Sequence, residues 1–177
     1  MRVTIVGAGY VGLTTAVGLA SVGHLVICVD IESDRVTAVN GGKLPFYEPG
    51  LGEMLSSVLS SRRLYATTEL ADAVVDSEVT IIAVGTPSTD HGIDLSYVTS
   101  AARVIGAALR RVSGYHVVVL KSTVVPGTTD TLVRRTLEES SGRAAGKFGL
   151  CMNPEFLREG SAIGDFMNPD RIVIGQW

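Results

Sequence analysis

The chain has 177 residues, of which 46% are hydrophobic, and its 15 Lys and Arg against 18 Asp and Glu give a formal net charge of −3. This length suits one domain, and the ordinary hydrophobic content with a small net charge excludes an intrinsically disordered chain. The charge also argues against a nucleic-acid partner, because phosphate neutralisation needs clustered Lys and Arg. Cys28 and Cys151 both lie in apolar runs, which excludes a disulfide scaffold.

Residues 3–29 contain no Asp, Glu, Lys or Arg and resemble a membrane segment at first sight. A spanning helix needs about 20 mainly apolar residues in one helix. Glycines interrupt this stretch at Gly7, Gly9, Gly12, Gly18 and Gly23. A buried strand, a glycine turn, a buried helix and a second buried strand explain the pattern better, because both faces of a parallel sheet are covered. The sequence therefore predicts a cytoplasmic protein with no membrane partner.

Strands alternate with helices along the chain. Runs of β-branched residues predict strands over residues 3–6, 25–29, 79–84, 115–120 and 148–152, with weaker candidates at 64–67 and 171–174. Helices are expected over about residues 11–21, 33–40, 50–60, 69–75, 95–111 and 128–140. This alternation predicts an α/β fold, a Rossmann-like, doubly wound and mainly parallel sheet with helices on both faces. Residues 1–177 form one domain in this interpretation.

Local signals mark several element boundaries. Asp94 is the expected N-cap of the helix over residues 95–111, and Pro126 with Gly127 breaks the chain before the helix over residues 128–140. Asn153 followed by Pro154 is typical of an N-cap with proline at the first helical position. A helical turn from Pro154 would place two acids, four residues apart at 155 and 159, on one face.

A glycine-rich turn follows the first predicted strand. It consists of Gly7, Ala8, Gly9, Tyr10, Val11 and Gly12. In a dinucleotide-binding unit the first glycine permits a tight turn, the second lets the backbone approach a pyrophosphate, and the third lets the helix pack closely on the strand. Backbone N–H groups and the positive helix end then hold the phosphates.

An acid closes the second predicted strand. Asp30 lies 23 residues after Gly7, close to the spacing of about 20 at which a carboxylate binds an adenosine ribose. Such a carboxylate repels a 2′-phosphate, so NAD is favoured over NADP. Arg35 either lies over the adenine, reaches a phosphate, or is only a solvated charge on a surface helix.

Three further loops follow predicted strands at the sheet edge where open α/β sheets bind ligands. They contain Val84, Gly85, Thr86, Pro87 and Ser88; Lys121, Ser122, Thr123 and Val124; and residues 153–160. The hydroxyls of Thr86 and Thr123 would point into one cleft and hold ribose, nicotinamide or a water, unless they only shape turns. Glu155 and Glu159 suggest proton transfer or the binding of ligand hydroxyls; the alternative is a role as acids that favour the start of a helix.

Six blocks of residues, in order along the chain, resemble the N-terminal domain of the UDP-glucose/GDP-mannose dehydrogenase family. They are residues 7–12, 47–51 (Tyr-Glu-Pro-Gly-Leu), 84–87 (Val-Gly-Thr-Pro), 122–127 (Ser-Thr-Val-Val-Pro-Gly), 153–160 and 168–171 (Asn-Pro-Asp-Arg). The blocks span nearly the whole chain, and the set is far more specific than any single block. The 168–171 block looks more like that of the UDP-sugar enzymes.

The resemblance implies two successive NAD-dependent oxidations of a sugar primary alcohol to a carboxylate, with UDP-glucose as the expected substrate, for polysaccharide biosynthesis. It implies contacts with NAD at residues 7–12, Asp30, Arg35, residues 84–88, Ser122, Thr123, Val124 and Glu159. By the same matching, Glu155 is the general acid/base and Thr123 helps to hold the water. The residues that would border the UDP-sugar are Glu155, Phe156, Leu157, Arg158 and Glu159.

The chain also departs from the family pattern. Family members use a nucleophilic cysteine in a glycine-rich segment, assisted by a lysine and an asparagine on a central helix, and this sequence has no such segment. Cys28 and Cys151 are expected to be small buried hydrophobes, and neither Lys121 nor Lys147 matches the family lysine. The expectation is a domain without the central helix and the UDP-sugar-binding domain, inactive alone and homodimeric in its full-length form.

Other interpretations stay open at this stage. GDP-mannose or another UDP-sugar is an alternative substrate. A β-hydroxyacid or phosphogluconate type of dehydrogenase also starts with a glycine turn, and a free-standing NAD sensor is the non-enzymatic alternative. His24 is expected to be structural, and His91 and His116 have no Cys or acid at ligand spacing, so no metal site is expected. The loop over residues 45–50, with Glu48, either borders the cofactor cleft or packs, and packing is the expected role.

Overall fold

A computed structural model describes residues 1–90, 92–144 and 146–176, so His91 lies outside the described residues. The strands are β1 (Arg2–Val6), β2 (Leu25–Val29), β3 (Leu64–Thr67), β4 (Val79–Ile82), β5 (Ser88–Thr89), β6 (Gly92–Ile93), β7 (Val117–Leu120), β8 (Gly149–Met152) and β9 (Gly175–Gln176). The helices are α1 (Tyr10–Ser21), α2 (Ser33–Asn40), α3 (Leu51–Ser60), α4 (Leu70–Val75), α5 (Ser96–Leu109), α6 (Arg134–Ser141) and α7 (Ala162–Met167), with a π-helical turn, η1 (Thr129–Val133), ahead of α6.

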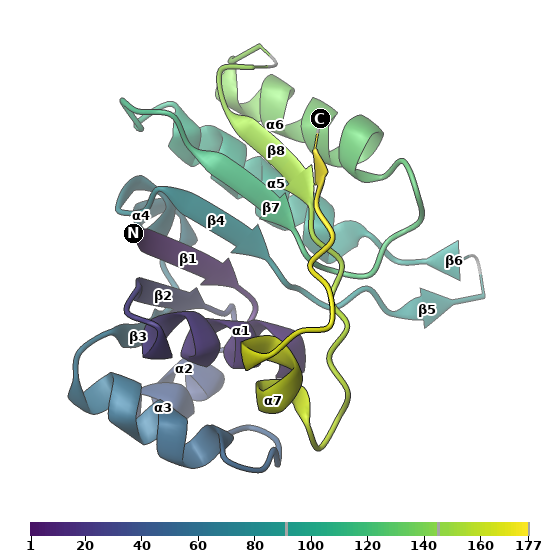
Figure 1. Cartoon of the computed structure of the whole chain (residues 1–177). Coiled ribbons are helices and arrows are strands. Elements are labelled where there is room, and N and C mark those ends of the chain that lie inside the picture. Colours follow the sequence, from purple (N-terminus) through teal and green to yellow (C-terminus); the bar gives the residue numbers. More distant parts are fainter. Residues whose placement is uncertain (91, 145, 177) are drawn as a thin grey trace.

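Seven strands form one sheet in the order β3-β2-β1-β4-β7-β8-β9 (Figure 1). All pairs are parallel except β8 with β9, and β5 and β6 make a separate antiparallel hairpin. Strand β1 lies between β2 and β4, so the chain order reverses direction there. The predicted Rossmann-like, doubly wound fold is confirmed, and the reversal marks the place where such sheets bind ligands.

Helices cover both faces of the sheet and bury two hydrophobic clusters. The first cluster joins Val3 and Ile5 of β1 to α1 and α3, where Leu13 and Leu55 are fully buried. The second joins β4, β7 and β8 to α5 and α6 on the other face. Neighbouring residues of β4 divide between the two, because successive side chains of a strand point to opposite faces. In Figure 1, α5 lies behind the arrows of β4 and β7.

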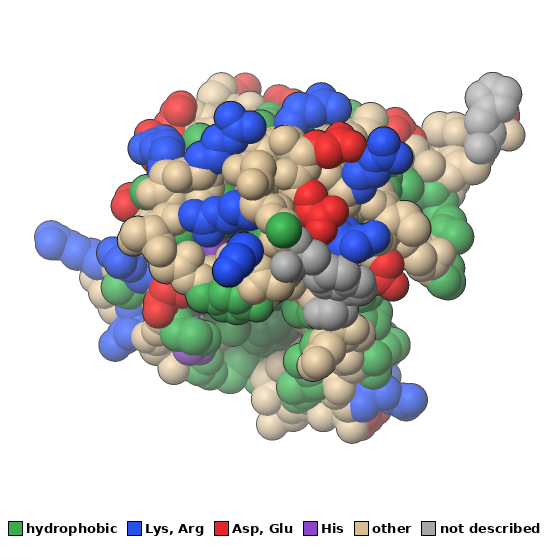
Figure 2. Space-filling model, turned by 90° about the horizontal axis from the view of Figure 1, so that it is seen from above, with side chains coloured by type: hydrophobic (Ala, Val, Ile, Leu, Met, Phe, Trp, Pro, Cys, Tyr) green, Lys and Arg blue, Asp and Glu red, His purple; other side chains and the backbone are tan. Residues whose placement is uncertain are grey.

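The outer surface carries mixed charges. Figure 2 shows Lys and Arg side chains interspersed with Asp and Glu over the face seen from above, with hydrophobic side chains around a hollow below them. None of the helices in the described part of the chain is long and apolar enough to cross a membrane.

The loop after β8 differs from the sequence prediction. Residues 153–161 are not helical, so the helical turn expected from Pro154 is wrong, and Glu155 and Glu159 do not share a helix face. The Glu155 side chain instead accepts the N–H of Leu157 at 2.7 Å. Acids that bond to their own backbone in this way compete with helix formation. The helix that does form, α7, begins seven residues later than Glu155, at Ala162.

Three further expectations need correction. The strand predicted over residues 171–174 is absent, and β9 forms at Gly175 and Gln176 instead. The helix predicted over residues 128–140 is divided into η1 and α6. The N-cap of α5 is Leu95 and not the predicted Asp94, which lies one residue earlier; the Oδ1 of Asp94 still accepts the N–H of Ser96, the first residue of α5, at 2.8 Å.

Candidate functional site: a cleft at the carboxyl edge of the sheet

The glycine turn between β1 and α1 has the backbone geometry that only glycine supplies. Gly7 has a φ of +104°, and a Cβ there would lie 2.6 Å from the carbonyl oxygen of Ala83. A Cβ at Gly12 would overlap the carbonyl oxygen of Gly7, so the first turn of α1 packs directly against the preceding loop. Gly9 faces open space, which leaves the backbone at the start of α1 accessible. An exposed helix start of this kind binds phosphate groups.

Asp30 is the buried acid of the site and is bonded to the glycine turn. Its side chain accepts the N–H of Ala8 at 2.7 Å and the N–H of Glu32 at 3.0 Å, and the residue is only 6% exposed. Arg35 reaches the same carboxylate, with its Nη1 3.0 Å from Oδ2. The structure therefore brings Ala8, Asp30 and Arg35 together. The Arg35 side chain is partly exposed, so this ion pair contributes at most about 1 kcal/mol.

The loops that follow β4 and β7 are joined by two side-chain hydrogen bonds. Ser122 donates its hydroxyl to the carbonyl of Val84 at 2.7 Å, and Thr86 donates its hydroxyl to the carbonyl of Thr123 at 2.7 Å. The two predicted cofactor loops are therefore neighbours, on the edge that also carries the glycine turn. The Thr86 hydroxyl is used in holding the loops together, and Thr123 is exposed.

The loop after β8 carries the predicted catalytic and substrate residues. Glu155 and Leu157 are half-buried, while Phe156, Arg158 and Glu159 are exposed. Arg158 binds Asp165 of α7 through its backbone N–H and its guanidinium, at 2.6 to 3.1 Å. The hydrogen bonds from Arg158 lower the pKa of Asp165 below its ordinary value. This pairing fixes the second half of the loop against α7.

A buried lysine lies beneath this loop. Lys121 is 7% exposed, and its Nζ donates to Oδ1 of Asn153 at 3.1 Å. Asn153 in turn donates to the carbonyl of Val173 at 2.9 Å, which ties the C-terminal segment to β8. Burial lowers the pKa of Lys121, and the negative charge of Glu155 opposes that shift. Lys121 thus supplies positive charge near the predicted acid/base.

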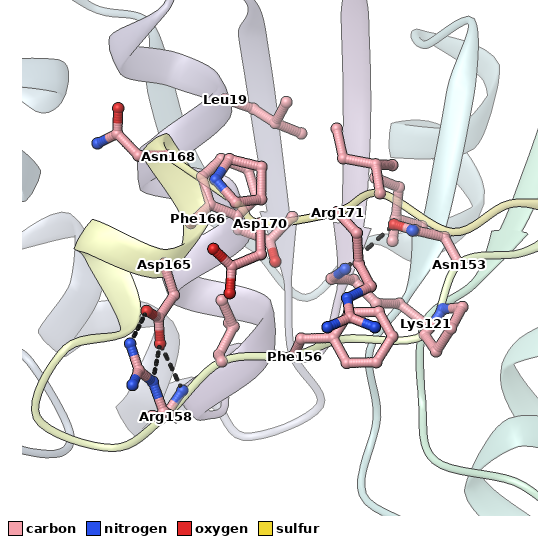
Figure 3. A pocket seen from close by; sticks show the side chains of 16 residues that line it. Leu19, Lys121, Asn153, Phe156, Arg158, Asp165, Phe166, Asn168, Asp170 and Arg171 are labelled. Carbon is pink, nitrogen blue, oxygen red and sulfur yellow. Dashed lines mark hydrogen bonds and ion pairs between the residues drawn. The ribbon is translucent and has the colours of Figure 1, made fainter.

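A cavity of about 650 Å³ opens between α1, α7 and this loop (Figure 3). The predicted substrate residues that line it are Phe156, Leu157 and Arg158. The other lining residues are Thr15, Leu19, Ile81, Lys121, Asn153, Pro154, Asp165, Phe166, Asn168, Pro169, Asp170, Arg171 and Ile172. Figure 3 shows the Arg158–Asp165 contacts at one end and Lys121 with Asn153 at the other. Thr123, Glu155 and Glu159 are outside this lining, so only part of the predicted substrate segment borders the cavity.

Sequence analysis missed the role of Glu48. Glu48 is 3% exposed and accepts hydrogen bonds from the Tyr10 hydroxyl, from the N–H of Gly160 at 2.9 Å and from the N–H of Ala162 at 2.8 Å. Phe46 of the same loop packs on Tyr10, with the ring centres 4.9 Å apart. The loop over residues 45–50 does pack, as expected, and it also connects the glycine turn to the loop after β8. A glutamate within an apolar and aromatic loop was the available signal.

The two cysteines have no features of nucleophiles. Cys28 is fully buried, and burial, followed by the charge of Asp30, raises the pKa of its thiol to about 12. Cys151 is only half-buried, which differs from the expected burial, and this partial burial raises the pKa of its thiol. Since the thiolate is the reactive form, both thiols are held in their inert state. Within the residues that the structure describes, no group of three or more His, Cys, Asp or Glu side chains could hold a metal ion.

Comparisons with known proteins agree with this geometry. The NAD-binding domain model of the UDP-glucose/GDP-mannose dehydrogenase family matches residues 1–177. UDP-glucose 6-dehydrogenase of Haloferax volcanii is 46% identical over 177 residues, which cover 99% of this chain and 41% of the relative. GDP-mannose 6-dehydrogenase of Pseudomonas aeruginosa is 46% identical over 178 residues, with 99% and 41% covered.

Solved structures give the same result. A ternary complex of GDP-mannose dehydrogenase from Pseudomonas aeruginosa has a TM-score of 0.97 at 45% identity, over 100% of this chain and 41% of that chain. A UDP-glucose dehydrogenase from Pyrobaculum islandicum has a TM-score of 0.94 at 47% identity, over 99% and 40%. The chain thus spans about two fifths of the length of these relatives, and the match favours a nucleotide-sugar dehydrogenase over the β-hydroxyacid alternative.

Proposed function

Because the chain belongs to the UDP-glucose/GDP-mannose dehydrogenase family, in which it is the NAD-binding domain, we propose that it serves an enzyme that oxidises the primary alcohol of a nucleotide sugar to a carboxylate. The observation that carries the proposal is the contact of Asp30 with the Ala8 N–H inside an open glycine turn. This contact places the acid that would bind the ribose beside the helix start that would bind the phosphates. NAD supplies the acceptor for the hydride that leaves the alcohol carbon in each oxidation.

The residues of the cofactor edge have distinct proposed tasks. Residues 7–12 bind the pyrophosphate, Asp30 binds the adenosine ribose, and Arg35, beside that acid, lies at the adenosine end. Residues 84–88 and 122–124 border the nicotinamide half, supported by the hydrogen bonds that join these loops. Glu159, exposed near the start of α7, completes the cofactor contacts.

Glu155 is the proposed general acid/base. One of its carboxylate oxygens accepts the N–H of Leu157, and lone pairs remain on the carboxylate for a substrate proton or a water. Thr123, exposed on the neighbouring loop, would help to hold that water. In the complete enzyme, Glu155→Gln should lower turnover by about 10² or more while NAD affinity changes little. Equal turnover of the Gln variant and the parent enzyme would contradict the assignment.

Turnover needs more than the residues of this chain. The family chemistry calls for a nucleophilic cysteine, but Cys28 is buried, Cys151 is half-buried, and burial raises the pKa of both thiols. The relatives are more than twice as long as the matched region. We therefore expect the chain to bind NAD without oxidising a nucleotide sugar, and to belong to a cytoplasmic, homodimeric enzyme of polysaccharide biosynthesis. Steady NADH formation from this chain and UDP-glucose would contradict that expectation.

UDP-glucose is the proposed substrate, supported by the 168–171 block, all four residues of which line the cavity. GDP-mannose is the second candidate, because relatives that use it are as similar to the chain as those that use UDP-glucose. The decisive experiment has two parts. Calorimetric titration of this chain with NAD and NADP should show binding of NAD and at least about tenfold weaker binding of NADP. NADH formation by the complete enzyme with UDP-glucose or GDP-mannose then identifies the sugar nucleotide.

A further inference from the structure

A buried carboxylate joins three segments that are far apart in the sequence. Glu48, from the loop before α3, accepts the Tyr10 hydroxyl and the Gly160 N–H at one oxygen and the Ala162 N–H at the other. Tyr10 belongs to the glycine turn and is the first residue of α1. Gly160 follows Glu159, and Ala162 begins α7. Glu48 therefore contacts both the pyrophosphate end of the site and the loop that carries the proposed acid/base.

The chemistry of this contact requires a charged acceptor. Every group that faces the carboxylate is a donor: one phenol and the N–H groups of Gly160, Ala162 and Ile163. Burial by itself would raise the pKa of Glu48, but these hydrogen bonds outweigh it and lower the pKa. A glutamine at this position would present its own donor NH₂ to backbone donors. Hydrogen bonds to an ionised acceptor are also about twice as strong as neutral ones.

The loop after β8 has a second attachment on the same helix. A Cβ at Gly18 of α1 would overlap the ring of Phe166 of α7, so the absence of a side chain at Gly18 makes room for that ring. Helix α7 thus lies directly on α1, and Glu48 fixes the segment between this packing contact and Glu159. The two attachments differ in kind. The contact of Gly18 with Phe166 depends on shape, whereas the contacts of Glu48 depend on a charge.

We propose that Glu48 is a positioning residue that holds the Glu155–Glu159 loop against the glycine turn and thereby couples the cofactor site to the loop that carries the acid/base. The inference rests on the proposed function, since it deepens the assignment of NAD to the glycine turn. Without the carboxylate, the loop has to be ordered when the cofactor binds, and that ordering lowers the affinity.

The first test compares three forms of the chain: wild type, Glu48→Gln, and the matched control Glu53→Gln, which changes an exposed glutamate of α3 in the same way. Calorimetry gives NAD affinity, and amide hydrogen exchange gives protection at Gly160 and Ala162. Glu48→Gln should lower NAD affinity at least about fivefold and release both amides, with the strands of the sheet still protected. Glu53→Gln should match wild type in both measurements.

Tyr10→Phe supplies a milder variant that removes one donor and leaves the carboxylate with its backbone partners. A double-mutant cycle on NAD affinity should show that Tyr10→Phe has a smaller effect in the Glu48→Gln background than in wild type, because both act through one contact. Additive effects would overturn the coupling. If Glu48→Gln fails to fold, Tyr10→Phe tests the proposal alone. The proposal is then overturned if Tyr10→Phe binds NAD within twofold of the wild-type affinity.

The outcomes also separate the two proposals. If wild type does not bind NAD, the proposed function fails. If wild type binds NAD and Glu48→Gln binds within about twofold of it, with Gly160 and Ala162 still protected, the positioning role fails and the proposed function stands.

Discussion

Replacing Asp30 with asparagine tests the cofactor site most directly, because the two side chains have the same shape. The carboxylate of Asp30 accepts hydrogen bonds from the N–H groups of Ala8 and Glu32 and from the Arg35 guanidinium. Asparagine offers one acceptor oxygen and two donor hydrogens. It can keep one backbone partner, and its NH₂ then faces the other. The substitution should therefore disturb the free protein as well as ligand binding.

The size of the effect follows from these contacts. Ala8 is fully buried, so a lost partner for its N–H, or for that of Glu32, costs about 1–3 kcal/mol. The partly exposed Arg35 pair adds at most about 1 kcal/mol. The free energy of unfolding should fall by about 2 kcal/mol. A ribose hydroxyl also loses a charged acceptor, which lowers NAD affinity about tenfold or more. The preference for NAD over NADP should shrink, because the negative charge that repels a 2′-phosphate is gone.

Urea unfolding gives the stability, and calorimetric titration with each dinucleotide gives the affinities. Asp34→Asn is the matched control, since Asp34 is an exposed acid in the first turn of α2 and should tolerate the change. The reasoning is refuted if Asp30→Asn and Asp34→Asn unfold at the same urea concentration and both keep the wild-type preference for NAD.

Three further predictions concern packing and pH. Gly12→Ala should lower stability by about 1–3 kcal/mol or more and weaken NAD binding, because its Cβ overlaps backbone of Gly7; an unchanged urea midpoint would contradict this. Gly18→Ala should cost less, about 1 kcal/mol, because the overlapped Phe166 ring can rotate, and amide exchange should increase in α7 while the sheet stays protected; unchanged α7 exchange would count against the contact. His116 is fully buried, and burial lowers its pKa below 6.5, so the folded state binds fewer protons than the unfolded state. The contribution of His116 to stability is therefore present above about pH 6.5 and is lost as the pH falls through the folded-state pKa. In unfolding experiments between about pH 7 and 5, His116→Gln should reduce the slope of the unfolding free energy against pH. An identical slope in the variant and wild type would refute this prediction.

The parts of the site that sequence analysis predicted are those set by one βαβ unit. The first strand, the glycine turn and the second strand are continuous in the chain, and parallel pairing of β1 with β2 brings the end of β2 beside the turn. The position of Asp30 beside the glycine turn therefore follows from the order strand, turn, helix, strand, whereas its bond to the Ala8 N–H was seen only in the structure. The strands that consist of β-branched runs were predictable for another reason. Both faces of this sheet are covered, so its strands are continuously apolar.

The parts that sequence analysis missed depend on contacts without a local signal. Glu48 is more than 100 residues from Gly160 and Ala162, and no spacing rule connects them. In the loop after β8, the Pro154 signal favours a helix, but the bond from Leu157 to Glu155 stabilises a different backbone. Residues 172–174 have strand-forming side chains, yet Ile172 is 71% exposed and the segment pairs with no strand in the described part of the chain. β-Branched residues form strands only where a partner strand and a packed face exist.

The two hydrophobic clusters on opposite faces of the sheet suggest how a bound dinucleotide would change the local unfolding of this domain. We expect each cluster to open as its own cooperative unit, with the boundary between the two units where β1 pairs with β4. The glycine turn lies at that boundary, since Gly7 packs against Ala83 just beyond β4. In the proposed binding mode, a dinucleotide would contact the β2 side of the sheet through Asp30 and the β7 side through the loop after β4. The binding energy of the dinucleotide would then oppose the opening of both units. The concentration of the cofactor would therefore set how often either unit unfolds locally.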